Sequence, residues 1–121
     1  MTTTVYNGRV IGPNNGSPST FTYTNSTGGN VRVIIYWFYG GAGSGGQGMY
    51  MKWGDLSGSD HCTARCANDD VFGKHVGGNA DLTYGSNVPT EMILSNGQSW
   101  KMEAMDSAGW GEYSIAVITE A

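Results

Sequence analysis

The sequence predicts an all-β domain, an antiparallel β-sandwich or jelly roll with about seven or eight strands. Glycine is far above its usual share, at 20 of 121 residues, and together with asparagine and serine it supplies turns. Charged residues make up only 13% of the chain, against about 25% in typical soluble domains. Short stretches of alternating apolar and polar residues lie between the turn clusters, and no stretch has the features of a credible helix.

The chain length corresponds to one domain, which we expect to span residues 1–121. A domain of about this size buries roughly two-thirds of the surface of its unfolded chain, so it does not need disulfides to fold. The regular pattern dissolves at about residues 54–87, where apolar residues occur only as short islands. We expect this segment to be a loop-rich insertion that contains short strands and either projects from the sandwich or has a functional role.

The N-terminal part predicts two strands separated by a turn. Residues 3–11 alternate loosely, and residues 20–24 place Phe21 and Tyr23 between threonines, which is the pattern of a half-buried strand. The glycine, proline and asparagine cluster at 12–19 predicts the turn that joins them.

Residues 31–39 predict a central strand. The β-branched and aromatic content, the short length and the flanking glycines favour a strand over a helix. One face is apolar throughout, and the other is apolar beyond Arg32. We expect one face to pack on the opposite sheet and the other against a neighbouring subunit. The first face consists of Val31, Val33, Ile35, Trp37 and Tyr39, and the second of Ile34, Tyr36 and Phe38.

Residues 49–53, 90–96, 99–105 and 112–120 predict four further strands. The Asn96-Gly97 pair is a strong signal for a tight hairpin between the second and third of them. Alternation assigns three residues in each of three strands to one face, and these are Met49, Met51, Trp53, Trp100, Met102, Ala104, Tyr113, Ile115 and Val117.

The glycine-rich segment 40–48 contains a formal G-x-G-x-x-G match at Gly41, Gly43 and Gly46. This motif binds dinucleotides only where it opens a helix whose N-terminal amides face the pyrophosphate. The segment that follows here is a predicted strand, and no Lys-Ser or Lys-Thr pair follows the glycines. We therefore interpret the segment as a flexible hairpin loop and predict no cofactor.

Four residues have the side-chain types of metal ligands: His61, Cys62, Cys66 and His75. Thiolates and imidazoles suit zinc, and four of them could close a tetrahedral site. However, three residues rather than two separate the cysteines, and His61 directly precedes Cys62, an awkward arrangement for one ion. A disulfide between Cys62 and Cys66 and a pair of free thiols are the alternatives, and the sequence leaves all three open.

The predicted insertion also contains candidate ligand or interface residues. Asp69 and Asp70 could ligate calcium, but no D-x-D-x-D-G ladder is present, so solvated loop acids are the simpler interpretation. Tyr84 is an aromatic candidate in the same segment. Trp110 lies between glycines in a predicted turn at 106–111, where it could stack on a sugar, anchor an interface or cap the end of the sandwich.

Charge and motifs argue against several functions. The formal net charge is −4 and the six lysines and arginines are scattered, which argues against a nucleic-acid partner. No stretch approaches the about 18 apolar residues of a membrane span. No G-x-S-x-G elbow is present, and both histidines lie in the predicted insertion, so no nucleophile constellation is apparent and we predict no enzymatic activity.

The N-terminus lacks the charged-then-apolar pattern of a signal peptide, so we expect synthesis in a cytoplasm. Asn25-Ser26-Thr27 matches a glycosylation acceptor. Without a secretion signal this tripeptide is more simply part of a turn, and we interpret residues 25–30 in that way.

The order of segments resembles small β-sandwich virion proteins of tailed bacteriophages, the modules of tail fibres, tail tips and capsid-decorating proteins. The resemblance covers roughly residues 20–39 and 88–120. It rests on two motifs, Leu94-Ser95-Asn96-Gly97-Gln98-Ser99 and Tyr113-Ser114-Ile115-Ala116-Val117-Ile118. It implies a mechanical or adhesive role in a virion made in a host cytoplasm. It also implies assembly with copies of the chain, as a trimer or larger oligomer, and with other virion proteins.

Three functions follow in order of preference. The first is a non-enzymatic virion structural protein, either a capsid decoration or a subunit of a tail fibre or tip. The second is a carbohydrate-binding module or receptor-binding tip that recognises a cell-surface glycan through Trp110, Tyr84 or the Asp69-Asp70 loop. The third, a distant alternative, is a metal-dependent enzyme built on the histidine and cysteine cluster.

Overall fold

The computed structural model describes residues 1–12, 20–42, 49–58, 61–65, 72–75, 91–104 and 109–119, with the backbone alone for 39–42, 50, 61–65 and 72–75. Every regular element within these ranges is a β-strand, and the strands come from the alternating segments seen in the sequence. Their bounds are β1 (Thr2–Ile11), β2 (Thr20–Thr24), β3 (Val31–Ala42), β4 (Met49–Gly54), β5 (His61–Arg65), β6 (Phe72–His75), β7 (Glu91–Leu94), β8 (Ser99–Ala104) and β9 (Gly109–Thr119).

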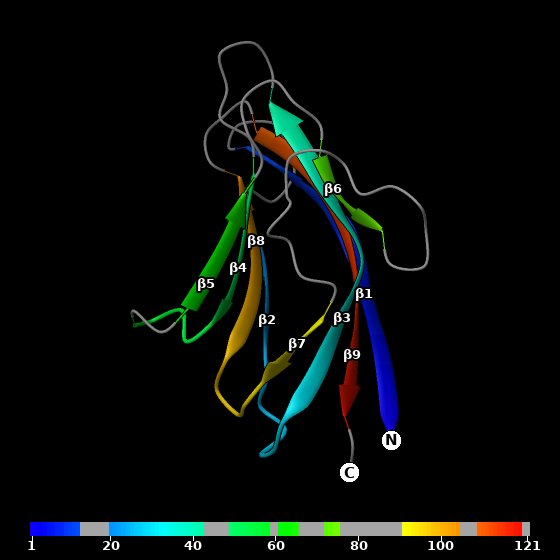
Figure 1. Ribbon diagram of the computed structural model, residues 1–121, viewed down its shortest axis with the longest axis vertical. Coiled ribbons are helices and arrows are strands. Elements are labelled where there is room, and N and C mark those ends of the chain that lie inside the picture. The colour runs from blue at the N-terminus through cyan, green and yellow to red at the C-terminus, as the bar shows by residue number, and fades with distance from the viewer. Residues whose placement is uncertain are drawn as a thin grey trace.

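The strands form two antiparallel sheets that face each other (Figure 1). In sheet A the order is β1-β9-β3-β6, and β7 pairs with the same edge of β3 as β6 does, further toward its N-terminal end. In sheet B the order is β2-β8-β4-β5. The prediction of an all-β antiparallel sandwich is confirmed. Two of the strands, β5 and β6, lie in the segment predicted as a loop-rich insertion.

The core lies between the inward faces of the two sheets. The alternation predicted for β4, β8 and β9 is confirmed, because the assigned residues are buried or pack against the core. Strand β3 contributes the other large share through Val31, Val33 and Ile35. The largest side chains with almost no exposed surface are Trp100, Phe38, Ile35, Met49, Met51, Leu94, Met102 and Ile115.

A β-bulge in β3 overturns one prediction about the core. Between Ile35 and Trp37 the pairing of β3 with β9 shifts by one residue, so the alternation reverses beyond that point. Phe38 consequently points inward and is fully buried, whereas Trp37 is 37% exposed. The prediction that Trp37 shares a face with Val31, Val33 and Ile35, and that Phe38 lies on the opposite face, was therefore wrong.

The Asn96-Gly97 turn does not close a hairpin, contrary to the prediction. Strand β7 pairs with β3 in sheet A and β8 pairs with β2 and β4 in sheet B, so the turn carries the chain from one sheet to the other. The turn itself is well formed. The Gln98 N–H donates to the carbonyl of Ser95 at 3.0 Å, and Gly97 has a φ of 91°, which a residue without a side chain adopts at little cost.

Two strand ends also differ from the predictions. Strand β9 begins at Gly109, so Trp110 lies within a strand, paired with Ile11 of β1 and Gly41 of β3, rather than in a turn. Strand β3 continues to Ala42, so the first glycine of the G-x-G-x-x-G match belongs to a strand. The remaining glycines of that match lie outside the described residues.

Candidate functional site

A cleft opens between the strands at one side of the sandwich. Strand β1 ends sheet A and β2 ends sheet B, and within the described residues each pairs on one side only, with β9 and β8 respectively. The inward faces of these two edge strands enclose a cleft of about 440 Å³. The two strands come from consecutive segments of the chain that lie in different sheets, so the cleft depends on the pairing order of both sheets.

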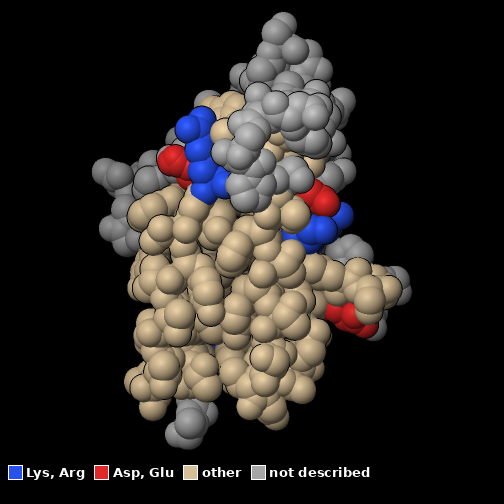
Figure 2. All heavy atoms as spheres, turned by 180° about the vertical axis from the view of Figure 1, so that it is seen from behind, with Lys and Arg blue, Asp and Glu red and all other residues tan. Residues whose placement is uncertain are grey.

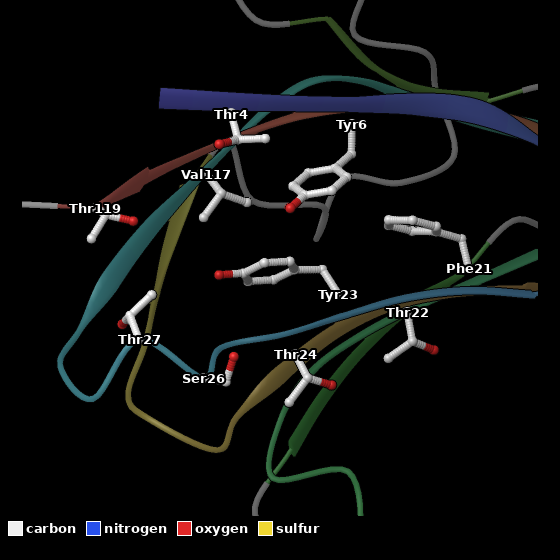
Figure 3. Close-up of a pocket in the computed structure, with 10 residues that line it drawn as sticks. All are labelled: Thr4, Tyr6, Phe21, Thr22, Tyr23, Thr24, Ser26, Thr27, Val117 and Thr119. Atoms are coloured by element: carbon white, nitrogen blue, oxygen red, sulfur yellow. The ribbon is translucent and has the colours of Figure 1, made fainter. Parts of the chain in front are cut away.

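The lining of the cleft combines aromatic rings with hydroxyl groups and contains no charged residue. Figure 3 shows Tyr6 of β1 and Tyr23 of β2 facing one another across the cleft, with both phenol hydroxyls directed toward the end where Val117 and Thr119 of β9 lie. Within the described part of the chain, no hydrogen bond engages either phenol hydroxyl. These groups are therefore free to bind water or a ligand.

A chain of ring contacts connects the cleft to the core. The ring centroids of Tyr6 and Tyr23 are 5.5 Å apart, and those of Tyr6 and Phe21 are 5.9 Å apart. Phe21 stacks on buried Tyr113 at 4.5 Å and 22°, and Tyr113 contacts the buried ring of Trp100 at 5.7 Å. Contacts of this kind stabilise each pair by about 0.5–1.5 kcal/mol beyond the burial of their area. The aromatic wall of the cleft is thus held by the core.

Gly8 makes room for this aromatic cluster. A Cβ atom at this position would lie 2.8 Å from the hydroxyl oxygen of Tyr113, which is closer than Cβ atoms approach other atoms, and 3.2 Å from its Cζ atom, which is a tight contact. The residue pairs directly with Tyr113 across β1 and β9. The missing side chain lets the Tyr113 ring lie over β1, where it supports Phe21.

The environment of the cleft favours the neutral form of the Tyr23 phenol. Burial raises the pKa of Tyr23 above its ordinary value, and the neighbouring Tyr6 raises it further. Burial also raises the pKa of Tyr113. Neutral phenols can donate one hydrogen bond and accept others, so near neutral pH the cleft offers polar groups of both kinds without a charge.

A turn centred on Asn25 forms one end of the cleft. Asn25 is completely buried, and its side-chain NH₂ donates to the carbonyls of Gly29 at 2.8 Å and Leu94 at 3.0 Å. Its side-chain oxygen accepts from the N–H and the hydroxyl of Thr27, at 3.0 and 2.7 Å. Ser26 and Thr27 line the cleft. This geometry favours the interpretation of Asn25-Ser26-Thr27 as a turn, because the amide that a glycan would need is buried and bonded.

The outward side of sheet A is a second candidate surface. Strand register places Val5 beside Ala116 and Ile34 in one row, and Ile118 beside Arg32 and Ile93 in the next. Val5 is 50% exposed and Ile93 is 57% exposed. We call this surface the outer apolar face; it consists of Val5, Ile34, Tyr36, Trp37, Ile93, Ala116 and Ile118.

Most of the metal-ligand and loop residues singled out from the sequence lie in segments that the structure describes only in part or not at all. His61 and Cys62 lie in β5 at the edge of sheet B, and His75 lies in β6 at the edge of sheet A. Within the described residues no group of three metal-ligating side chains occurs. The side chains of these three residues lie outside the described ones, as do Cys66, Asp69, Asp70 and Tyr84 entirely. The zinc, disulfide, free-thiol and calcium hypotheses therefore stay predictions.

The cleft residues were not predicted as a site. The sequence indicated that Phe21 and Tyr23 are half-buried, which the structure confirms, but gave no reason to join them with Tyr6. The available signal was the composition of the two N-terminal strands. Residues 2–6 and 20–24 contain threonines and aromatic residues and no charge, although both strands turn out to be sheet edges.

Comparison with known proteins finds no match to a protein family, to a curated protein or to a solved structure. In the part of the chain that the structure describes, no helix is long and apolar enough to cross a membrane. The function is therefore inferred from the cleft and from the outer apolar face.

Proposed function

We propose that this protein is a non-enzymatic structural subunit of a virion, of the kind found in tailed bacteriophages, and that it acts by self-assembly. The observation that carries the proposal is the outer apolar face of sheet A. The sequence predicted that β3 would need a neighbour on its second face. In the structure this face exposes Trp37, Val5 and Ile93 to solvent.

Val5, Tyr36, Trp37 and Ile93 are exposed, and the buried residues Ala116 and Ile118 lie between them in the strand rows. Single exposed apolar side chains are common on proteins, but contiguous apolar patches usually mark an interaction surface. Here the pairing of four strands, β1, β9, β3 and β7, brings the residues together in adjacent rows. A hollow of about 170 Å³ beside Arg32, Ile93 and Ile118 could accept a side chain of a second copy.

The charges on this face suit a second copy of the chain. Arg32 and Glu91 lie in adjacent rows, paired with Ile93 and Ile34 respectively, and no ion pair joins them within the described residues. The Nε of Arg32 is buried and has no hydrogen-bond partner there. Because Arg32 and Glu91 have opposite charges, Arg32 of one copy can pair with Glu91 of the next, and these two charges then balance at the interface.

The strand order supports a jelly-roll connection, an architecture that recurs in viral capsid and lectin domains. The chain passes between the sheets at each step from β1 to β4, runs β4 and β5 as neighbours in sheet B, and returns to sheet A at β6. Strand β7 is an addition to this scheme. Fold alone does not define function, so the apolar face remains the main support.

Sedimentation velocity across a range of protein concentrations tests the proposal. We expect the wild-type chain to form a discrete oligomer. Ile93→Lys places a charge on the outer apolar face and should lower the association constant by at least about tenfold, since one buried unpaired charge costs several kcal/mol. The matched control is Thr20→Lys, an exposed strand residue of sheet B, which should associate like the wild type.

A wild-type chain that remains a monomer at all concentrations would contradict the proposal. Equal effects of Ile93→Lys and Thr20→Lys would also contradict it, because association would then not depend on this face. The melting temperatures of both variants show whether a loss of association reflects unfolding, since neither exposed residue contributes to the core.

A further inference from the structure

The cleft between β1 and β2 is unrelated to the outer apolar face and lies on the inward faces of the two sheet edges. Its volume of about 440 Å³ falls within the range of roughly 300–1,000 Å³ typical of ligand sites. Three aromatic side chains and several hydroxyl groups line it. Tyr6, Phe21 and Tyr23 supply the rings, and the hydroxyl groups include those of Thr4, Thr27 and Thr119.

The lack of charge in the lining restricts the ligand. A carboxylate, phosphate or ammonium group would lose hydration without gaining a partner of opposite charge. Seen from behind, the half of the molecule nearest the two termini, at the bottom of the view, has charged side chains only along one edge (Figure 2). A purely apolar ligand fits poorly as well, because it would cover the hydroxyls and leave them without hydrogen bonds.

We propose that this cleft binds a neutral saccharide. A sugar ring presents C–H groups on its faces and hydroxyls around its edge, so it matches a lining in which rings and hydroxyls alternate. Phenol and threonine hydroxyls can each donate and accept, as sugar hydroxyls do. The ring of Tyr6 or Tyr23 supplies an apolar surface, and the phenol hydroxyls supply polar contacts at its rim.

The orientation of the side chains favours this assignment. Both tyrosine hydroxyls point toward the same end of the cleft, where Thr119 of β9 and Thr27 of the turn after β2 lie (Figure 3). The hydroxyl of Thr27 already donates to the side-chain oxygen of Asn25 at 2.7 Å. Hydroxyls from β1, β2 and β9 therefore line one end of the cleft. Thr22 and Thr24 point to the other side of β2, and they are not part of the proposed contact.

The cleft is also fixed in shape before any ligand arrives. The stacking of Phe21 on Tyr113 holds one wall, and the buried Asn25 holds the turn that carries Thr27. A site formed by side chains that are already ordered loses little conformational entropy when it binds.

The test is a binding titration observed by saturation-transfer NMR. The probes are neutral trisaccharides of glucose, mannose, galactose and N-acetylglucosamine, with sialyllactose and a sulfated disaccharide as charged comparisons. We expect at least one neutral probe to bind, and the charged probes to bind more weakly. Tyr6→Phe and Tyr23→Phe each remove one hydroxyl and retain the ring, so each should weaken binding by roughly fivefold to tenfold.

The control variant is Thr20→Ala, in the same strand as Tyr23 but outside the cleft, which should bind like the wild type. The proposal is overturned if no neutral probe binds, if charged probes bind equally well, or if both tyrosine variants bind like the wild type. Repeating the titration with Ile93→Lys separates this result from self-assembly. Loss of association there should leave saccharide binding unchanged, because Ile93 lies outside the cleft.

Discussion

The outward faces of the two sheets differ in how they meet solvent. On sheet B, the outward positions of β8 and β4 include Lys101, Glu103 and Lys52, and threonines occupy those of β2. Glu103 forms ion pairs with Lys52 at 3.5 Å and with Lys101 at 3.2 Å. On sheet A the corresponding rows contain valine, isoleucine, tyrosine and tryptophan together with Arg32 and Glu91. The outward face of sheet B is therefore well solvated, whereas burial of the outward face of sheet A against another surface would be favourable.

This difference identifies the outward face of sheet A as the surface of the sandwich that still exposes apolar side chains. The two sheets share one core, and the inward faces of both are fully apolar in their central strands. An apolar face that remains outside is stabilised only when another surface covers it, at about 25 cal/mol per Å² of apolar area. The polar face of sheet B has no such tendency. The following variants test this contrast, beginning with the one that should have the largest effect on stability.

Asn25→Ala should cause the largest loss of stability, because this residue joins the two sheets. Its side chain connects the turn after β2 of sheet B to the end of β7 in sheet A. The substitution removes the side-chain donor to the buried carbonyl of Leu94 and the acceptor of the Thr27 N–H and hydroxyl, which we expect to lower the free energy of unfolding by about 3 kcal/mol. Chemical denaturation followed by circular dichroism measures the change.

Asn30→Ala is the matched control for this variant. Asn30 is an exposed residue of the same turn, and its loss should change the free energy of unfolding by less than about 0.5 kcal/mol. If Asn25→Ala is no more destabilising than Asn30→Ala, the junction between the sheets does not depend on the buried amide.

Glu103→Gln on sheet B and Glu91→Gln on sheet A should have different effects on stability and self-association, each smaller than the effect of Asn25→Ala on stability. Lys52 and Lys101 stand directly opposite each other in the pairing of β4 with β8, and Glu103 offsets their repulsion. Because these side chains are about one-third exposed, Glu103→Gln should lower the free energy of unfolding by only about 0.5 kcal/mol, and less at high salt.

Glu91→Gln is expected to change self-association rather than the stability of the monomer. It should leave the stability of the monomer unchanged, because Glu91 has no ion pair within the described residues, and should weaken self-association measurably. Thermal melts at two salt concentrations and sedimentation at two protein concentrations distinguish the variants. Identical profiles for the two would show that the contrast between the faces has no energetic consequence.

The sequence predicted the sandwich and most of its core because these depend on local alternation. In β4, β8 and β9 the apolar positions recur at every second residue, and the structure buries the assigned side chains or packs them against the core. The prediction failed at Trp37 and Phe38, because a bulge inserts one residue into β3 and reverses the faces. The amino-acid sequence around Tyr36 contains no signal that predicts the position of that bulge.

Features that depend on pairing order could not be predicted. The Asn96-Gly97 signal correctly predicted a turn, but whether the flanking strands pair or separate depends on β3, which lies far away in the chain. The cleft has the same origin. Tyr6 and Tyr23 meet because β9 and β8 place β1 and β2 at adjacent edges, a relation that neither segment encodes alone.

A dilution series monitored by NMR tests the central claim most directly, because it reports both the existence and the location of self-association. We expect the signals of Val5, Ile34 and Ile93 on the outer apolar face to shift between dilute and concentrated samples. Signals from the outward face of sheet B, such as those of Thr22 and Lys101, should stay constant. No shifts at any concentration, or shifts confined to sheet B, would contradict the account.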